Sequence, residues 1–475
     1  MFFLFFHFLC VIGQGDETLE LTYLSKIQEP AWAWGSEANV FVSNDRLYIS
    51  LGYPGLAVYD ISNPEFPQRI LYMHSADLGG QVGAVAASGD RMFVATPDKN
   101  SLAVLDISNP SNPIVLTRFG AIHSILQISL RGQQLYVHAG SSTQYYGGVY
   151  VFDVSKEMPE LVGEYLTDLI DPGFYVNGQG VVFLARTPAS FGDSAKVDAI
   201  AMGDPSNPIY LGRWESPYPG NIVDIDMKGH FLYCSAYWGG LWILDASDFS
   251  DINFIARYDW LKPEPFALSA QGLPPFVFLA QGGPELSFQK FNVYRLDNAL
   301  ITLEKEIPAM TYTQSVYLFG DLLILIEKES PWETTNPQKI LHLYQVPTSR
   351  PKPPLYPLLT REINRSLFRK EAFHTIYWSP NPENKEFVIT EYRVYRKYPD
   401  QADIDYKMIG SVPGDVFEFV DGYLDFSNRF MYAVTSVEES GFESEKTTPV
   451  ESDIMRSESL QKKRRINFMS KIYKE

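Results

Sequence analysis

Short stretches in which apolar and polar residues alternate recur along residues 19–346. In one clear unit they cover residues 82–87, 91–95, 101–107 and 114–118, with Gly, Asp, Asn and Pro between them. A period of two over such short stretches is typical of half-buried β-strands, and the intervening residues are typical of turns. No stretch in this region keeps a helical period, so the pattern predicts an all-β chain.

The alternating units are copies of one another. The clearest copies are GLAVYDISNP at 55–64 and SLAVLDISNP at 101–110, followed by GVYVFDVS at 148–155 and GLWILDAS at 240–247. Weaker copies include 197–202, 291–295 and 341–345. The Asp position of each copy falls at 60, 106, 153, 201, 245, 295 and 345, so the spacing of 44 to 50 residues predicts seven units.

Four strands per unit predict a seven-bladed β-propeller over residues 19–346. A linear solenoid is the competing geometry, but no capping unit is evident. The seventh unit shows three strands and lacks a fourth, whereas residues 19–27 resemble the fourth strands of other units. We therefore expect the N-terminal strand to complete the last blade and close the ring, which removes two free sheet edges.

The repeated L-x-V-x-D-I-S-N-P copies resemble the LVIVD repeat family. The resemblance covers roughly residues 19–346, but the Asp is replaced by Ala201, Arg295 and Gln345 in three units. It implies the β-propeller fold of exported prokaryotic proteins, and it implies little chemistry.

A second domain is expected after a Pro-rich linker at 347–357. Alternating segments at 387–396, 406–412, 417–421 and 430–437, with Trp378 and Tyr432 at expected core positions, resemble a fibronectin type III domain over residues 352–452. The resemblance implies an immunoglobulin-like β-sandwich of the usual size, about 100 residues. Residues 453–475 form a basic tail that contains Lys462, Lys463, Arg464 and Arg465.

The chain begins with twelve almost wholly apolar residues, which are too few to span a bilayer as a helix. With Gly13 and Gly15 placed for cleavage, residues 1–15 are interpreted as a signal peptide, although a basic start is missing. We therefore expect an exported protein: periplasmic, cell-surface or secreted. A lipid anchor at Cys10 and a buried N-terminal strand are the weaker alternatives.

Composition narrows the function classes. Lys and Arg number 39 and Asp and Glu 57, a net charge of −18, which argues against a nucleic-acid partner. Two Cys exclude a disulfide framework and a multi-Cys zinc site. Phosphate-loop, dinucleotide, serine-hydrolase and zinc-protease motifs are absent. No cofactor and no metal site are expected, with a structural cation in the propeller channel left open.

Candidate binding residues lie in the long, irregular connections expected on one face of the ring. Regular scaffolds commonly bind through such loops, and surface aromatic side chains stack on sugars or anchor protein partners. The candidates are Trp34, Tyr145, Tyr146, Tyr237, Trp238, Trp260 and Trp332. The repeated Asp residues are instead expected to cap turns.

Four weaker candidates for catalysis come from the inner strands and the channel mouth. They are Asp224 and Asp226, the only acidic pair on an inner strand, with His123 and Glu37. A hydrogen-bonding role in a wet channel is the alternative for Asp224.

Three functions follow from these residues. The first is an exported, non-catalytic binding, adhesion or scaffold protein that presents the loop face to a protein or a glycan at the cell surface or in the envelope. The second is a polysaccharide hydrolase or lyase with acidic residues at the channel mouth. The third is a structural envelope component without a small ligand.

Overall fold

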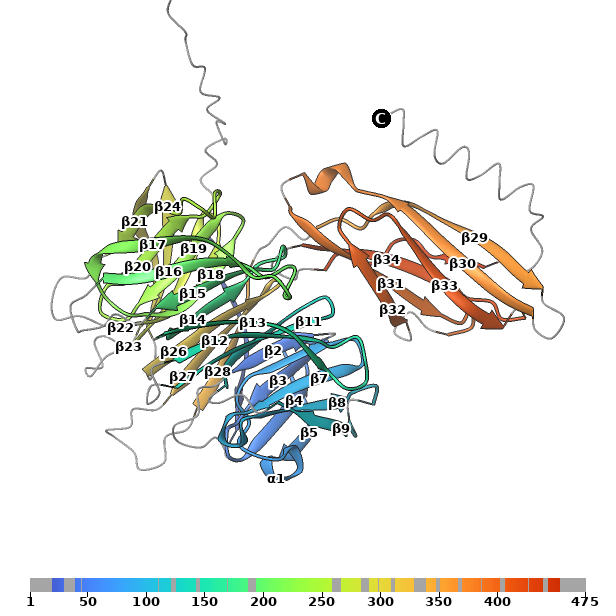
Figure 1. Ribbon diagram of the computed structural model, residues 1–475, viewed down its shortest axis with the longest axis horizontal. Coiled ribbons are helices and arrows are strands. Elements are labelled where there is room, and N and C mark those ends of the chain that lie inside the picture. The colour runs from blue at the N-terminus through green and yellow to red at the C-terminus, as the bar shows by residue number, and fades with distance from the viewer. Residues whose placement is uncertain are drawn as a thin grey trace, which may run out of the picture.

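The chain is built almost entirely of β-strands that form a ring of sheets and a separate two-sheet module (Figure 1). The computed structural model describes residues 19–29, 39–43, 45–109, 111–120, 125–141, 146–168, 170–186, 194–258, 266–282, 290–297, 299–308, 312–328, 339–346, 351–365, 370–385, 387–401, 406–425, 427–438 and 443–452. Helix is confined there to α1 (Ser75–Leu78) and the short turns η1 (Pro97–Lys99) and η3 (Pro382–Asn384). The all-β prediction is confirmed.

Seven four-stranded antiparallel sheets make up the ring among the described residues. In six of them the strands follow one another in chain order. The first three of these are β2 (Val40–Ser43), β3 (Arg46–Ser50), β4 (Gly55–Asp60), β5 (Gln68–His74); β6 (Val85–Ser88), β7 (Arg91–Thr96), β8 (Ser101–Asp106), β9 (Ile114–Phe119); and β10 (Ile125–Arg131), β11 (Gln134–Ser141), β12 (Tyr146–Asp153), β13 (Glu160–Asp168). The next three are β14 (Ile170–Val176), β15 (Val181–Arg186), β16 (Ser194–Ala201), β17 (Ile209–Pro219); β18 (Ile222–Lys228), β19 (Phe231–Ala236), β20 (Gly240–Asp245), β21 (Asn253–Tyr258); and β22 (Phe266–Leu273), β23 (Phe276–Gly282), β24 (Lys290–Asp297), β25 (Leu300–Pro308).

The seventh sheet combines both ends of the ring segment. It contains β26 (Tyr312–Phe319), β27 (Leu322–Lys328), β28 (Lys339–Gln345) and, on its outer edge, β1 (Thr22–Gln28). β1 runs antiparallel to β28, with Thr22 opposite Gln345 and Gln28 opposite Ile340. The N-terminal strand therefore supplies the fourth strand that the seventh repeat lacks, as the sequence predicts.

The ring is held together by apolar seams between neighbouring sheets. Each of seven buried clusters in the described part of the chain draws side chains from two consecutive sheets. The cluster that joins the β26–β28 sheet to the β2–β5 sheet contains Ile324 and Ile49, so the last sheet packs against the first. Because every sheet has an apolar neighbour on both faces, the ring is closed.

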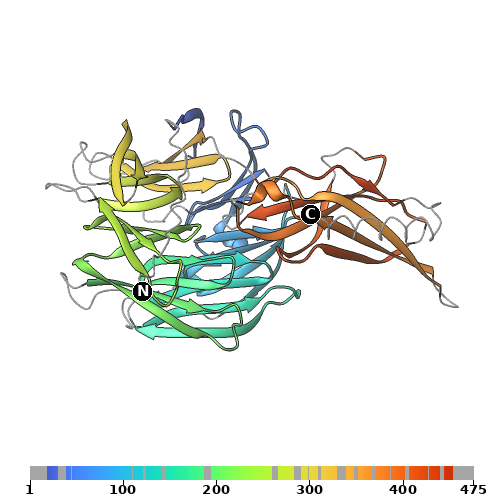
Figure 2. The same cartoon turned by 90° about the horizontal axis from the view of Figure 1, so that it is seen from above.

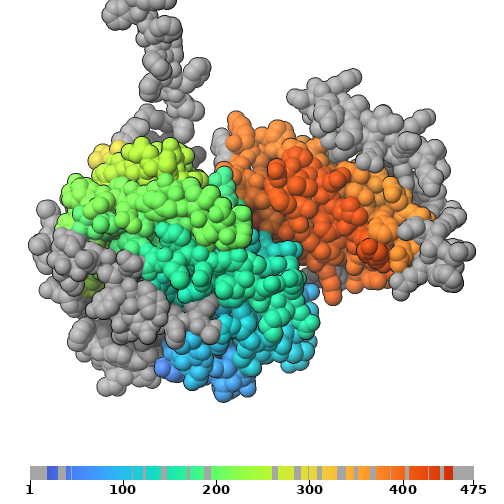
Figure 3. Space-filling model, viewed as in Figure 1, coloured from blue at the N-terminus to red at the C-terminus, as the bar shows by residue number. Residues whose placement is uncertain are grey.

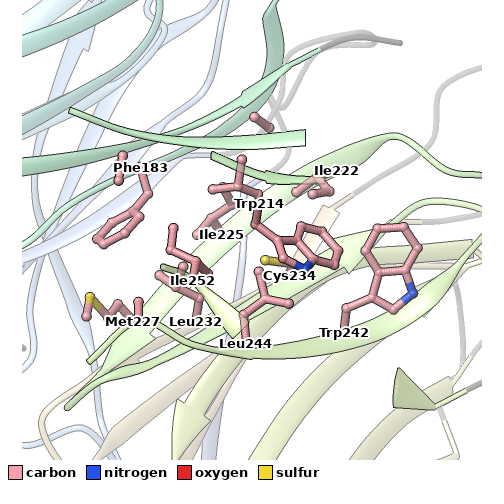
Figure 4. Packing of buried hydrophobic residues seen from close by; sticks show 14 of the residues in the cluster. Phe183, Trp214, Ile222, Ile225, Met227, Leu232, Cys234, Trp242, Leu244 and Ile252 are labelled. Atoms are coloured by element: carbon pink, nitrogen blue, oxygen red, sulfur yellow. The ribbon is translucent and has the colours of Figure 1, made fainter. Parts of the chain in front are cut away.

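The seam between the β14–β17 sheet and the β18–β21 sheet is rich in large side chains (Figure 4). Phe183 and Trp214 come from the first sheet, and Cys234 and Trp242 from the second. The rings of Trp214 and Trp242 meet edge to face, 5.6 Å apart. Trp242 is fully buried, and truncating a side chain of this size to Ala costs about 3–5 kcal/mol.

The second module consists of two antiparallel sheets that enclose their own core. One has the order β29 (Leu355–Arg365), β30 (Lys370–Ser379), β33 (Glu418–Asp425), and the other β32 (Lys407–Pro413), β31 (Ile389–Lys397), β34 (Met431–Glu438), β35 (Val450–Glu451). Trp378, Tyr392 and Tyr432 lie fully buried between the sheets, as expected for Trp378 and Tyr432. β29 begins at Leu355, within the segment expected to be linker.

The two-sheet module contacts the ring directly. In Figure 3 the orange and red module abuts the green and teal part of the ring, and in Figure 2 it lies at one end of the ring strands. Lys228, at the end of β18, forms an ion pair with Glu438, at the end of β34, with Nζ 2.9 and 3.1 Å from the two carboxylate oxygens.

No helix in the described residues is long and apolar enough to cross a bilayer.

Candidate functional site

The repeated Asp residues cap turns. A carboxylate oxygen of Asp60, Asp106, Asp153 and Asp245 accepts a hydrogen bond from the backbone N–H two residues later, at 2.8–2.9 Å. Hydrogen bonds from Ser62 hold the pKa of Asp60 below its usual range. The capping role predicted for these residues is confirmed, and each carboxylate serves its own turn rather than a shared site.

The inner-strand acids Asp224 and Asp226 bind the next inner strand. Asp224 Oδ2 accepts hydrogen bonds from Ser269 Oγ at 2.8 Å and from the Ala270 N–H at 3.2 Å. Asp226 Oδ2 accepts one from the Gly272 N–H at 2.8 Å. Both acids lie on β18 and all three partners on β22, so the pair ties two neighbouring sheets together at the centre of the ring.

Burial changes the acidity of Asp226. The pKa of Asp226 is raised to about 7, mainly because burial disfavours the charged carboxylate. The nearby Asp224 carboxylate raises this pKa further, whereas the hydrogen bond from the Gly272 N–H lowers it. A raised carboxyl pKa is common at catalytic sites, but buried structural groups also show it. Here the carboxylates point at backbone and hydroxyl donors of β22, which favours the hydrogen-bonding role over the catalytic one.

Other inner strands make the same kind of contact. Gln127 Nε2 on β10 donates to the Pro172 carbonyl on β14 at 3.1 Å, and Arg131 donates to the Val176 carbonyl at 2.6 and 2.9 Å. Side chains of one inner strand thus satisfy backbone groups of the next, which a buried backbone requires. The hydrogen bonds of Asp224 and Asp226 are of the same kind, because they also join one inner strand to the next.

Two catalytic candidates remain besides Asp224 and Asp226. His123 and Glu37 lie outside the described residues. The described part of the chain contains no group of three His, Cys, Asp or Glu side chains that could hold a metal ion.

A cluster of one exposed and two half-buried aromatic side chains lies on the loop side of the β18–β21 sheet. We call Tyr237, Trp238 and Phe266 the aromatic step. Tyr237 stacks on Phe266 with ring centroids 4.4 Å apart and an angle of 8°, and Trp238 stands edge-on to both rings at 5.2 and 4.5 Å. Trp238 is 47% exposed, whereas burial raises the pKa of Tyr237.

The backbone holds the aromatic step in place. The Tyr237 N–H donates to the Asn221 carbonyl at 2.9 Å, and the Tyr237 carbonyl accepts from the Ala267 N–H at 3.1 Å. Gly239 closes the turn, and a Cβ there would lie 2.5 Å from the Trp242 ring, so the turn requires glycine. The exposed indole is therefore carried by a turn within the β18–β21 sheet that is hydrogen-bonded to the next sheet.

Sequence reasoning singled out two of the three rings. Tyr237 and Trp238 were predicted binding residues, and the structure brings them together. Phe266 was missed, because it is the first residue of β22 in the next unit and no local pattern marks it. Tyr146 is the first residue of β12, whereas Trp34, Tyr145, Trp260 and Trp332 lie outside the described residues.

The LVIVD repeat family matches this chain at residues 35–70, 79–120 and 219–260. The third segment carries β18 to β21 and the Tyr237–Trp238 turn. These repeats are consistent with the ring of four-stranded sheets and with the apolar seams that close it. The chain is a repeat β-propeller protein. No curated protein matches it.

Solved structures of low identity resemble the chain. Saccharomyces cerevisiae Sqt1 shares 9% identity over 76% of this chain and 99% of its own, with a TM-score of 0.48. A functionally unknown protein from Desulfotomaculum acetoxidans shares 12% over 61% of this chain and 89% of its own, with a TM-score of 0.46. The WD40 β-propeller domain of Doa1 shares 9% over 69% of this chain and 97% of its own, with a TM-score of 0.46. The propeller assignment stands on the sheet order, the seams and the repeats.

Proposed function

We propose that this chain is an exported, non-catalytic binding or adhesion protein. In this proposal a seven-bladed propeller presents its loop face to a protein or glycan partner, and a fibronectin type III-like sandwich serves as its support. The aromatic step carries the proposal. A half-exposed indole on a rigid turn offers stacking area with little loss of side-chain freedom, as sugar-binding and protein-binding surfaces often do.

Three buried or partly buried carboxylates of the described ring support the non-catalytic part. Asp224 and Asp226 bind the neighbouring strand. Asp198, which is 1% exposed, accepts two hydrogen bonds from Arg213 and lies 3.5 Å from Arg186. Asp224 and Asp226 thus join two neighbouring sheets, and Asp198 joins three strands of one sheet.

A comparison of Trp238→Ala with Tyr423→Ala tests the binding surface. Tyr423 is 80% exposed on β33 of the sandwich, so it controls for loss of any exposed aromatic ring. On a glycan array and in pull-downs against defined envelope proteins, Trp238→Ala is expected to lose at least tenfold in affinity and Tyr423→Ala to keep it. Equal affinity of wild type and Trp238→Ala contradicts the proposal.

Export rests on the apolar residues 1–12 and the small residues after them. Expression of the full chain in a bacterial host, with N-terminal sequencing of the exported fraction, is expected to give a start near residue 16. A lipid-modified Cys10 at the new N-terminus would show an anchored form instead, and an uncleaved cytoplasmic chain would contradict export.

A further inference from the structure

The ring and the sandwich meet at one defined place. Lys228 is the last residue of β18 and pairs with Phe231 across the turn at Gly229 and His230, so its backbone is held within a hairpin. Glu438 is the last residue of β34 and lies opposite Ile389 of β31. The charged groups therefore project from two ordered sheets.

The ion pair is shielded from water. The side chain of Lys228 is 18% exposed and that of Glu438 only 3%. A charge buried to this degree is strongly disfavoured without its partner. The contact joins residues 210 positions apart, so it forms only when the two modules are docked.

The chain leaves the ring on the same side. Gln345, the last residue of β28, lies opposite Leu322, which follows the turn at Gly320 and Asp321. This turn and the turn after Lys228 both join the first and second strands of their sheets, so they lie on one face, the turn face. The short connection to Leu355 therefore starts on the face where the sandwich is docked.

The aromatic step lies on the opposite face. Ile222, the first residue of β18, is paired with Ala236, directly before Tyr237 and Trp238. Lys228 is six residues further along β18, roughly 20 Å away at the rise of a β-strand. Docking on the turn face thus leaves Trp238 open.

We propose that the sandwich is docked in one fixed orientation on the turn face of the propeller by the ion pair of Lys228 and Glu438, which we call the latch. The latch sets the orientation in which the loop face points away from the sandwich. This inference concerns the arrangement of the two modules and does not depend on any ligand of the aromatic step.

Charge reversal and its rescue test the latch. In small-angle X-ray scattering of the chain, wild type is expected to fit one rigid arrangement. Lys228→Glu is expected to increase the maximum dimension and require several arrangements, and Lys228→Glu with Glu438→Lys to restore the single one. Lys305→Glu, an equal charge change at an exposed position of β25, serves as control and is expected to match wild type.

Two results would overturn the latch. One is a wild-type chain that itself requires many arrangements, and the other is a Lys228→Glu profile equal to that of Lys305→Glu. If Lys228→Glu does not fold, Glu438→Gln replaces it. This variant removes the charge but keeps the shape, so a wild-type profile for folded Glu438→Gln also contradicts the latch.

Discussion

Replacing Asp226 by Asn removes one titrating group from the centre of the ring. The side-chain oxygen of Asn can still accept the hydrogen bond from the Gly272 N–H that Asp226 accepts at 2.8 Å. The amide does not titrate between pH 4 and pH 8. The substitution therefore isolates the electrostatic cost of ionising a carboxyl in this position.

The expected size follows from the pKa. Burial raises the pKa of Asp226 from 3.8 to about 7. Below pH 3.8 the folded and unfolded chains both hold the proton, so the carboxyl costs no stability. As the pH rises towards 7 the unfolded chain ionises first, and wild-type stability falls by up to roughly 4 kcal/mol, at about 1.4 kcal/mol per pKa unit.

Urea denaturation of wild type and Asp226→Asn at several pH values between 4 and 8 tests this reasoning. The stability of Asp226→Asn relative to wild type is expected to rise with pH by a few kcal/mol and to level off above pH 7. Asp106→Asn, a carboxylate in an exposed turn, is expected to show no such rise. A difference between Asp226→Asn and wild type that stays constant or falls from pH 4 to pH 8 would refute the reasoning.

Three further substitutions or probes test the buried groups. Asp198→Ala is expected to destabilise the chain by about 3 kcal/mol, because it leaves Arg213 and Arg186 without their shared buried carboxylate, as urea midpoints would show. Asn177→Ala is expected to cost about 2 kcal/mol in the same assay, because Asn177 Oδ1 accepts from the Val181 N–H at 2.9 Å and from the Gln179 N–H at 3.0 Å; a loss within error of zero contradicts it. The Cys234 thiol is fully buried and burial raises its pKa, so a disulfide reagent is expected to react with it only in denaturant; rapid labelling of Cys234 itself in the folded chain would show that the seam opens.

Local pattern was enough to predict the strands, the repeat and its turns. The Asp of each good copy caps a turn within its own unit, so everything needed to predict it lies within a few residues. The N-terminal strand could be assigned to the last sheet because that unit lacked a strand. These are questions of period and count, which one sequence answers.

Contacts between units were harder to predict. No local pattern indicated that Ser269 and Ala270 of β22 donate hydrogen bonds to Asp224 of β18. Both strands have a bulge near their beginning, between Ala267 and Ser269 in β22 and between Ile222 and Asp224 in β18. The extra residue of a bulge interrupts the alternation of buried and partly exposed positions, so alternation alone does not predict which side chains of these strands meet.

The long-range partners could not be predicted at all. Phe266 joins the aromatic step from the next unit, and Glu438 reaches Lys228 from the other module. Neither carries a motif, because such contacts are selected by the folded arrangement rather than by neighbours in the chain. A single sequence holds no record of these pairings.

The pairing of β1 with β28 has a consequence for biosynthesis. β1 leaves the ribosome first, but its partner Gln345 emerges only after more than 300 further residues have been added. Until β28 has been synthesised, the nascent ring keeps an open edge and β1 has no strand with which to pair. Contacts between distant parts of a chain form slowly, so closure is expected to be the last and slowest event in making the ring. A nascent chain that lacks β28 therefore leaves β1 without the strand to which it is hydrogen-bonded in the folded ring.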